Sequence, residues 1–396
     1  MVVIVNALRT PIGKFGGSLA NIPPEDLVSI TIQNCLSHSS YDGNIVDEVI
    51  IGQTKQSAHT PNIARVASLK ADLPISTSAY TVHRQCGSGM QAVHNAYMSI
   101  ALGQSEVVMA GGVESMSQAP YYFVGNRFGI KPGNMVLFDS NTESQPKSQP
   151  EELFGTFTMG ETAEFLAEKY NISRSEQDEF AVWSQIKAKN AIASGRFDNE
   201  IVPISVKESK YNVRLFAVDE HPRETTLQAL SKQNPVFKSG GTVTAGNSSG
   251  RNDGAAVMLL MKEEKALALG LTPMAKIISF GSSGVNPKEM GIGPVSATAK
   301  ALQSAGLRLQ DMGLIELNEA FAAQAIAVMR EWQSNGENVN VNGGAIALGH
   351  PLGCSGARIL VTLAHELQKR DARYGLATLC IAGGQGVSTI IEKWKT

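Results

Sequence analysis

The first 117 residues alternate between short apolar runs and segments with helical periodicity. Runs rich in β-branched residues at Val2–Asn6, Val46–Gly52 and Thr77–Val82 predict strands. Apolar residues at helical spacing predict helices over Pro24–Leu36 and Asn62–Ala71. This alternation is typical of an α/β fold with a largely parallel sheet.

One strand–turn–helix unit places a cysteine at the bend. The hexapeptide Arg-Gln-Cys-Gly-Ser-Gly at 84–89 follows the strand predicted at 77–82, and a helical pattern then runs to Gly103. The next run, Glu106–Gly112, predicts a buried strand that ends in a glycine turn. Cys86 therefore lies where a strand turns into a helix.

The pattern changes between residue 118 and about residue 244. Asp139–Glu152 is polar and interrupted by prolines, which predicts an exposed loop. Helices are predicted at Glu161–Tyr170 and Ser173–Ser194, and the second opens with a Ser-x-x-Glu capping box. We interpret this region as an insertion over the α/β core, and such segments commonly carry substrate contacts.

The remainder of the chain predicts a second α/β unit. An apolar strand at Ala255–Met261 precedes it, and the unit begins at residue 271. Its end has a glycine-rich turn at Gly349–Gly356, a helix at Ala357–Leu367 and a strand at Leu376–Ile381. That strand runs into Ala-Gly-Gly, as the last strand of the first unit does, so we infer an internal duplication about a pseudo-twofold axis.

Length and composition limit the possible domains and functions. A chain of 396 residues predicts two or three domains, because single cores seldom grow so large. Its 43% hydrophobic and 18% charged residues are ordinary for a globular enzyme, and a net charge of -2 favours neither nucleic acid nor an anionic membrane as partner. We place the boundaries at 1–117 (N-terminal half), 118–244 (loop domain), 245–269 (return segment of the first half) and 270–396 (C-terminal half).

The sequence also indicates a compartment. No apolar run is long enough to span a bilayer, and no basic segment precedes the first strand as in a secretory signal. The four cysteines, at positions 35, 86, 354 and 380, have no paired spacing, which indicates a reducing environment. We therefore expect the cytoplasm.

Cys86 is the first candidate catalytic residue. Free N–H groups and the positive dipole end of a helix N-terminus favour the thiolate, which is the nucleophilic form. A buried structural cysteine is the alternative, since free cysteine packs well in cores. The glycines of Gly87-Ser88-Gly89 favour the nucleophile, because we expect packing alone to require no glycine pair at a helix start.

Three further segments carry reactive groups. His350 lies in a turn between glycine and proline, Cys380 ends a buried strand, and Asn318 begins an alanine-rich helix together with neighbouring carboxylates. Each has a structural alternative: a core histidine, a small strand residue and a helix cap.

Together these segments resemble the thiolase family over nearly the whole chain. The motifs that resemble those of the family are Cys86-Gly87-Ser88-Gly89, Asn318-Glu319-Ala320-Phe321, Gly349-His350-Pro351 and Cys380 with the glycines that follow it. Condensing synthases of fatty-acid synthesis share the fold but lack the second cysteine, so Cys380 argues against them. A non-catalytic acyl-CoA-binding relative would lack Cys86 or His350.

The resemblance implies five α-β-α-β-α layers with an inserted loop domain, and ping-pong acetyl transfer between coenzyme A thioesters. His350 would take the proton of Cys86, and Cys380 would act as acid and base. Backbone N–H groups of Cys86 and Ala382 would form one oxyanion site, and His350 with a water held by Asn318 the other. No metal or organic cofactor is expected, because acetyl-CoA, acetoacetyl-CoA and CoA are substrates and no Cys-x-x-Cys spacing supports zinc.

The resemblance also implies contacts with the substrate. Arg223 would lie near the adenine and phosphates, and Ser249 near the pantetheine, with the Ala245 turn and Met159 also on this side. Met290 and Phe321 would line the acyl pocket. The alternatives are a solvated charge for Arg223 and plain core packing for Met290 and Phe321.

Three departures from the family pattern concern the substrate. Thr158 stands where the acetoacetyl class usually has histidine, Gln85 where it usually has leucine, and Ala382 where glycine is common. The run Val285–Gly291 is similar to the short-chain group. We therefore expect acetyl-CoA C-acetyltransferase activity, interconverting two acetyl-CoA with acetoacetyl-CoA and CoA, with longer 3-ketoacyl-CoA substrates as the alternative.

The resemblance further implies a homodimer or a dimer of dimers, in which residues 121–140 form the tetramer contact. A redox role is a separate possibility, in which Cys86 and Cys380 form a disulfide switch.

Overall fold

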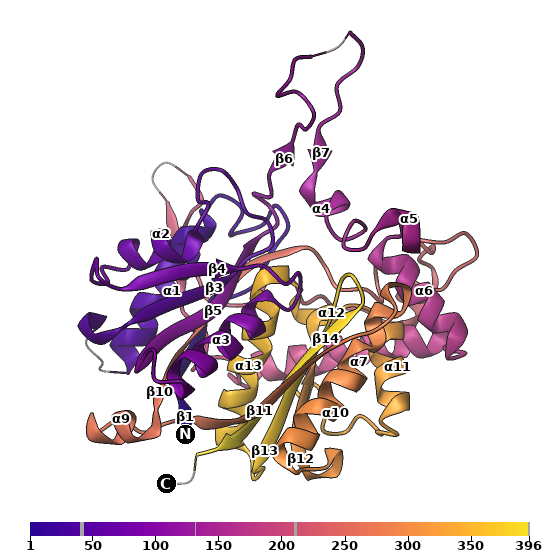
Figure 1. Cartoon of the computed structure of the whole chain (residues 1–396). Coiled ribbons are helices and arrows are strands. Elements are labelled where there is room, and N and C mark those ends of the chain that lie inside the picture. Colours follow the sequence, from indigo (N-terminus) through magenta and orange to yellow (C-terminus); the bar gives the residue numbers. More distant parts are fainter. Residues whose placement is uncertain (40–42, 131, 210–211, 395–396) are drawn as a thin grey trace.

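A mixed sheet runs through the molecule and joins two similar halves at its centre (Figure 1). The strand order of the first half is β4 (Ser78–Val82), β3 (Glu48–Gly52), β5 (Val107–Ser115), β10 (Asn252–Lys262) and β1 (Val2–Arg9). The second half has β12 (Met312–Leu317), β13 (Tyr374–Ile381), β14 (Gln385–Lys393) and β11 (Ala275–Gly284). Antiparallel pairing of β1 with β11 joins the halves.

The computed structural model describes residues 1–39, 43–130, 132–209 and 212–394. Some predicted segments therefore extend outside the described residues. They are the contact segment 121–140 at residue 131, the loop domain at 210–211 and the C-terminal half at 395–396. The domain boundaries given above remain predictions.

Both halves have the same pattern of strand pairing, which confirms the predicted duplication. The outer strands are parallel: β3 pairs with β4 and β5, and β12 pairs with β13. The inner strands are antiparallel, as β5, β10 and β1 in one half and β13, β14 and β11 in the other. The predicted largely parallel sheet is thus wrong, because β14 returns directly from β13 by a tight turn and no helical crossover separates them.

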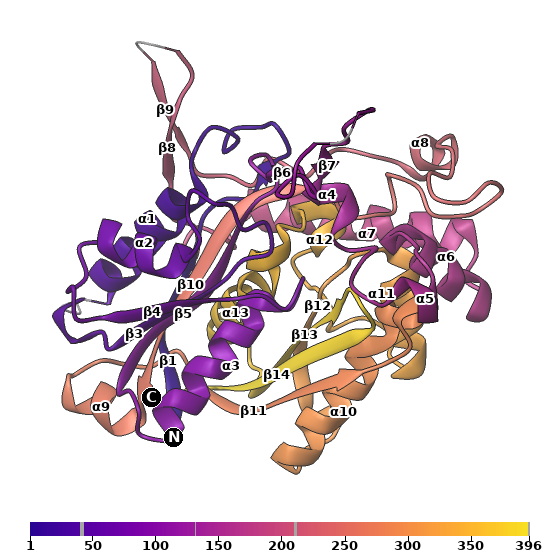
Figure 2. The same ribbon diagram turned by 45° about the horizontal axis from the view of Figure 1, so that its top comes forward.

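Helices form three layers around the two half-sheets, and the predicted five α-β-α-β-α layers are confirmed (Figure 2). In the middle layer α3 (Ser88–Ala101) and α13 (Leu352–Lys369) share one apolar core with both half-sheets. The outer layers are α1 (Pro24–His38) and α2 (Ile63–Lys70) on the first half, and α10 (Gly293–Ala305) and α11 (Ala322–Glu331) on the second.

The chain between β5 and β10 forms the inserted region. Its longer helices are α6 (Met159–Lys169) and α7 (Arg174–Ala193), and the predicted Ser173–Glu176 capping box of α7 is confirmed. The shorter elements there are β6 (Tyr121–Tyr122), β7 (Phe138–Asp139), α4 (Ser140–Glu143), α5 (Glu151–Phe154), β8 (Ile204–Lys207), β9 (Val213–Phe216) and α8 (Leu227–Ser231). Elsewhere the short elements are β2 (Gly13–Lys14), α9 (Glu263–Ala268), α12 (Ala345–Leu348) and the 3-10 helices Gly43–Ile45, Pro287–Ile292 and Leu309–Asp311.

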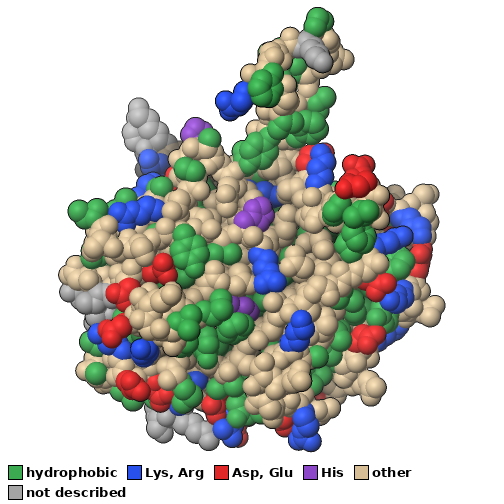
Figure 3. All heavy atoms as spheres, viewed as in Figure 1, with side chains coloured by type: hydrophobic (Ala, Val, Ile, Leu, Met, Phe, Trp, Pro, Cys, Tyr) green, Lys and Arg blue, Asp and Glu red, His purple; other side chains and the backbone are tan. Residues whose placement is uncertain are grey.

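An arm between β6 and β7 projects from the body of the molecule (Figure 1). Hydrophobic side chains lie along it in Figure 3, and Phe128 is 100% exposed. The predicted exposed loop at 139–152 is only partly correct, because Ser140, Asn141 and Gln145 are buried against the body. Among the described residues, no helix is both long and apolar enough to cross a membrane.

The two Ala-Gly-Gly segments have different structures. Gly383 and Gly384 form a turn with positive φ values of 86° and 79°, whereas β5 continues through Gly111 and Gly112 to Ser115. A Cβ on Gly112 would lie 2.1 Å from the carbonyl oxygen of Gly353. The predicted glycine turn after 106–110 is therefore wrong: Gly112 serves the close approach of β5 to α13.

The predicted glycine-rich turn at 349–356 is also shorter than expected. Helix α13 already begins at Leu352, so Gly353 and Gly356 are helical. A Cβ on Gly356 would lie 2.7 Å from the backbone nitrogen of Met90 in α3. These glycines let the two central helices pack backbone to backbone.

We expect Gly112→Ala to destabilise the protein by about 1–3 kcal/mol, the usual cost of overpacking a core. The added methyl group would meet backbone atoms, which cannot rotate away. Urea unfolding measures the effect. Gly284→Ala is the matched control, because its Cβ would have its nearest neighbour at 3.9 Å. Equal losses in the two variants would contradict this account.

Candidate active site

Cys86 lies in the bend between β4 and α3 and is 8% exposed. Gln85, immediately before it, has a left-handed backbone with φ +45°. The hydroxyl of Ser88 fixes the bend, because it accepts from the Arg84 N–H at 2.8 Å and donates to the Gln85 carbonyl at 2.6 Å. This geometry holds the cysteine at the junction of strand and helix, as predicted.

The glycines beside Cys86 have a packing function. A Cβ on Gly87 would lie 2.5 Å from Ile381, and one on Gly89 would lie 2.7 Å from the Gly353 carbonyl oxygen. Both contacts join the first half to the second. Our expectation that packing requires no glycine pair here is therefore wrong, and the case for a nucleophile depends on what surrounds the sulfur.

The structure brings the main predicted groups into one cavity. A cavity of about 250 Å³ is lined by Cys86, His350, Cys380 and Ala382. These residues come from three separate segments: the β4–α3 bend, the turn before α13 and the end of β13. The backbone N–H of Ala382 donates a hydrogen bond to the sulfur of Cys86. The two halves of the duplicated fold thus meet at this cavity.

Both cavity cysteines are protonated at neutral pH. Burial raises the pKa of Cys86 to about 11, although the Ala382 N–H and the ammonium of Lys55 act in the opposite direction. Burial and the neighbouring Cys86 sulfur raise the pKa of Cys380 well above its ordinary value. The predicted preference for the thiolate is therefore wrong in the free protein, because desolvation outweighs the helix N-terminus.

His350 is a neutral imidazole that can accept a proton. Burial, together with the positive charge of Arg358, lowers the pKa of His350 to about 3. Its Nδ1 lies 2.6 Å from the hydroxyl oxygen of Ser355, which donates its own proton to the Pro351 carbonyl at 2.9 Å. The hydroxyl must then accept from Nδ1–H, so Nε2 carries no proton. The network assigns Nε2 as the basic atom.

Asn318 lies in the connection between β12 and α11 and is not a helix cap, since Phe321 occupies that position. Neither its Oδ1 nor its Nδ2 has a partner among the described residues, although the side chain is fully buried. Ala320 and Phe321 of the same loop line the cavity that holds Cys86, whereas Asn318 is not part of the described lining. A buried unpaired amide of this kind is available to hold a water or substrate atom.

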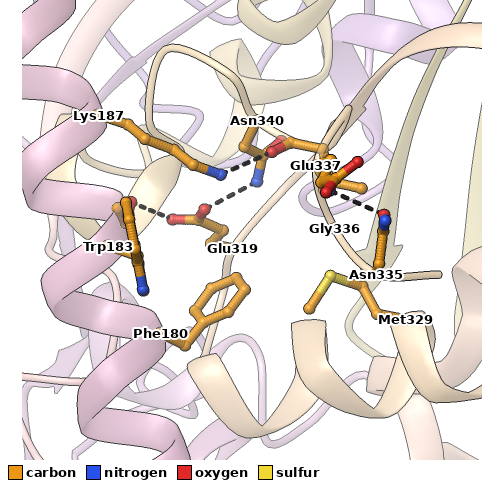
Figure 4. Close-up of a pocket in the computed structure, with 11 residues that line it drawn as sticks. Phe180, Trp183, Lys187, Glu319, Met329, Asn335, Gly336, Glu337 and Asn340 are labelled. Carbon is orange, nitrogen blue, oxygen red and sulfur yellow. Dashed lines mark hydrogen bonds between the residues drawn. The ribbon is translucent and has the colours of Figure 1, made fainter.

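The next residue, Glu319, fixes this loop from behind. Its carboxylate accepts from Ser184 Oγ at 2.6 Å, Asn340 Nδ2 at 2.8 Å and the backbone N–H of Ile346 at 3.2 Å. Figure 4 shows the contact between Asn340 and Glu319, which lie at a second cavity of about 410 Å³ together with Lys187. The position of Asn318 is thus set by a rigid hydrogen-bonded support.

The predicted substrate contacts divide into two groups. Met159, Ser249, Met290 and Phe321 line the cavity that holds Cys86, and the ring of Phe237 packs edge-on against Phe321. Arg223 and Ala245 are not in its described lining, and lie together outside it with the Arg223 guanidinium 3.3 Å from the Ala245 carbonyl oxygen.

Sequence reasoning missed part of this site. Asn141, Thr142 and Gln145 line the cavity from the segment predicted as exposed loop, and the buried Lys55 lies close to Cys86. Their polar composition gave no signal, because only tertiary contacts bury them. In the described part of the chain the four cysteines are free, and no cluster of three or more His, Cys, Asp or Glu could hold a metal.

Comparison with known proteins identifies the family. Residues 2–264 match the thiolase N-terminal domain and residues 271–393 match the thiolase C-terminal domain. The chain therefore belongs to the thiolase family, a family of enzymes.

Individual relatives are similar over the full length. An acetyl-CoA acetyltransferase of Pseudomonas aeruginosa is 51% identical over 393 residues, covering 99% of both chains. The structure of an acetyl-CoA acetyltransferase from Bacillus anthracis superimposes with a TM-score of 0.96 at 47% identity, over 99% of this chain and 98% of that one. Human mitochondrial 3-ketoacyl-CoA thiolase superimposes with a TM-score of 0.95 at 43% identity, over 100% of this chain and 99% of that one.

We expect alkylation of Cys86 by iodoacetamide to accelerate steadily as the pH rises from 7 through 9, without a plateau below the ordinary thiol range. The raised pKa leaves only a small thiolate fraction at neutral pH, and each unit of pH adds about tenfold. Mass spectrometry of the peptide that contains Cys86 measures the rate. A plateau at pH 7 would show instead that the thiolate predominates in the free enzyme.

Proposed function

We propose that this protein is an acetyl-CoA C-acetyltransferase that interconverts acetoacetyl-CoA and CoA with two acetyl-CoA. One observation carries the proposal: Cys86, His350 and Cys380 share one buried cavity, and a backbone N–H is directed at the Cys86 sulfur. This arrangement combines a nucleophile, a neutral base and a second proton donor. The names of full-length relatives support the same reaction.

In the cleavage direction the Cys86 sulfur attacks the 3-keto carbon of acetoacetyl-CoA while His350 Nε2 accepts the thiol proton. The bond between C2 and C3 then breaks, and C2 takes the proton of the Cys380 thiol to give acetyl-CoA. This half-reaction leaves an acetyl group on Cys86, an imidazolium at His350 and a thiolate at Cys380. Proton and electron pair are thus both accounted for.

The second half-reaction restores the enzyme. The Cys380 thiolate takes the proton of CoA, and the CoA sulfur attacks the acetyl group on Cys86. The departing Cys86 sulfur recovers its proton from His350. Burial of all three groups favours their neutral forms. In the resting state the two thiols therefore hold the protons that they transfer, and the His350 imidazole is free to accept one.

Negative charge on the substrate oxygen also needs donors. The backbone N–H groups of Ala382 and Cys86 are proposed for the tetrahedral intermediate, and His350 with a water on Asn318 for the enolate. The contact of the Ala382 N–H with the Cys86 sulfur supports the first assignment, and the unpaired amide of Asn318 supports the second. The two backbone donors are fixed before the reaction, which makes them effective, and His350 becomes a donor once its Nε2 has taken the Cys86 proton.

The cavity supports a short acyl group. Its volume is about 250 Å³, and Met290, Phe237 and Phe321 fill its apolar side. A longer 3-ketoacyl-CoA is the second candidate, favoured by Gln85 and Thr158 and by the similarity to human mitochondrial 3-ketoacyl-CoA thiolase. Thr158 lines the cavity and also caps α6, so a histidine there would alter both.

We expect acetoacetyl-CoA to be cleaved faster than 3-ketohexanoyl-CoA, and a long-chain 3-ketoacyl-CoA to be cleaved slowest. Cys86→Ala and Cys380→Ala should each lose at least about a thousandfold in kcat, because each removes a group that takes part in bond making. Thiolysis followed by loss of 3-ketoacyl-CoA absorbance measures both. Faster cleavage of the longer substrates would assign the enzyme to fatty-acid degradation, and an active Cys86→Ala variant would refute the mechanism.

We propose a homotetramer built as a dimer of dimers, located in the cytoplasm. Exposed hydrophobic side chains on the arm support the assembly, with Tyr121, Val124 and Ile130 each 64% exposed. The free cysteines suit a reducing compartment.

Replacing residues 122–137 by a short Gly-Ser linker should reduce the native mass from four copies to two. The arm's apolar side chains would no longer be buried between dimers. Light scattering after size exclusion measures the mass, with Phe128→Asp in the intact arm as a milder variant. A wild-type protein that runs only as a monomer would contradict the assembly.

A further inference from the structure

Lys55 is a buried lysine beside the proposed nucleophile. It follows β3 and is 4% exposed. Its ammonium donates to the Ser140 carbonyl at 2.6 Å, to Ser144 Oγ at 2.5 Å and to Gln145 Oε1 at 3.4 Å. All three acceptors are uncharged, so no partner in this set neutralises the lysine's charge.

The acceptors belong to a segment, residues 140–148, which we call the wall segment because Asn141, Thr142, Gln145 and Pro146 line the catalytic cavity. Its other end is tied to the residue before the nucleophile. The Gln85 amide donates to Ser148 Oγ at 2.9 Å and to the Ser144 carbonyl at 3.5 Å. Lys55 and Gln85 therefore hold the same wall from two places.

The wall segment also touches the second cysteine's turn. A Cβ on Gly383 would lie 2.7 Å from the Ser148 carbonyl oxygen. The segment thus lies against both catalytic loops, the one before α3 and the one after β13. A shift of the wall would change the space available to an acyl chain.

Two groups of negative charge act on the ammonium of Lys55: first Glu114 of β5, and next the Cys86 sulfur when it is ionised. The Glu114 carboxylate also accepts from the backbone N–H groups of Lys55 at 3.0 Å and Gly353 at 2.9 Å, and from Thr54, so it is fixed in place. The lysine also interacts electrostatically with Asp139 on β7, Arg251 before β10 and His83 after β4. Cys86 itself is influenced by Lys55, Glu114 and the Cys380 sulfur.

We propose that Lys55 is a positioning residue of the catalytic site: it fixes the wall segment, and its positive charge stabilises the thiolate that Cys86 forms in each half-reaction. The inference rests on the proposed role of Cys86. A cation held by three neutral acceptors in a region of low dielectric acts more strongly on a nearby anion than a solvated one does. Burial lowers the pKa of Lys55, and formation of the thiolate acts in the opposite direction.

Three variants separate the charge from the positioning. Lys55→Met removes both, Lys55→Arg keeps the charge, and Gln85→Leu loosens the wall segment without a change of charge. The readout is the rate of Cys86 alkylation by iodoacetamide as a function of pH, measured on the intact enzyme by peptide mass spectrometry. This rate requires no turnover.

The Lys55→Met profile should shift to higher pH by about one unit, so that alkylation at pH 8 is about tenfold slower. Lys55→Arg should restore the wild-type profile, and Gln85→Leu should leave it unchanged. Lys55→Met and Gln85→Leu should both raise the rate on 3-ketohexanoyl-CoA relative to acetoacetyl-CoA severalfold. If Lys55→Met does not fold, Lys55→Gln, which retains an N–H donor, should show the same pH shift.

The inference would be overturned if Lys55→Met or Lys55→Gln had the same alkylation profile as the wild type. It would also be overturned if Lys55→Arg, which keeps the charge, did not have the wild-type profile. The proposed function fails by a different result, namely acyl transfer that persists in Cys86→Ala. The two failures are therefore distinguishable in the same set of variants.

Discussion

The backbone contact between the two central helices determines where the proposed catalytic groups lie. Gly89 of α3 and Gly353 of α13 approach so closely that no side chain fits between them, and Gly112 of β5 completes the contact. Cys86 lies two residues before α3, and His350 lies two residues before α13. Because the helices pack backbone to backbone at these ends, the reactive groups of the two halves meet in one cavity. A larger residue at any of the three glycines would separate them.

This packing has an electrostatic consequence. A cavity so well shielded from water favours neutral groups, and the two thiols and the imidazole are indeed neutral at rest. In the proposed mechanism charge appears only while substrate reacts, and the groups that would stabilise it surround the cavity. The Ala382 N–H faces the nucleophile, and the ammonium of Lys55 lies nearby. The fold thus disfavours the thiolate in the free enzyme, and in the proposed mechanism the same surroundings support it during the reaction.

The sequence allowed prediction of the features that depend on local pattern. Cys86, His350 and Cys380 lie in short motifs, and the duplicated halves follow from repeated strands and glycines. The order and direction of the strands were not predictable. Gly383 and Gly384 form a turn after which β14 runs antiparallel to β13, whereas the similar sequence Gly111–Gly112 continues a strand. The burial of Lys55 and of the wall segment was also missed, because polar residues become part of a site only through contacts distant in the sequence.

The most direct test of the central claim is to locate the acetyl group on the enzyme. The wild-type protein is mixed with acetyl-CoA, the reaction is stopped with acid, and each cysteine-containing peptide is weighed by mass spectrometry. The account predicts an acetyl group on the peptide that carries Cys86, and its loss in Cys86→Ala. An acetyl group on another cysteine would contradict it. So would an unmodified Cys86 in an enzyme that does exchange acetyl groups with CoA.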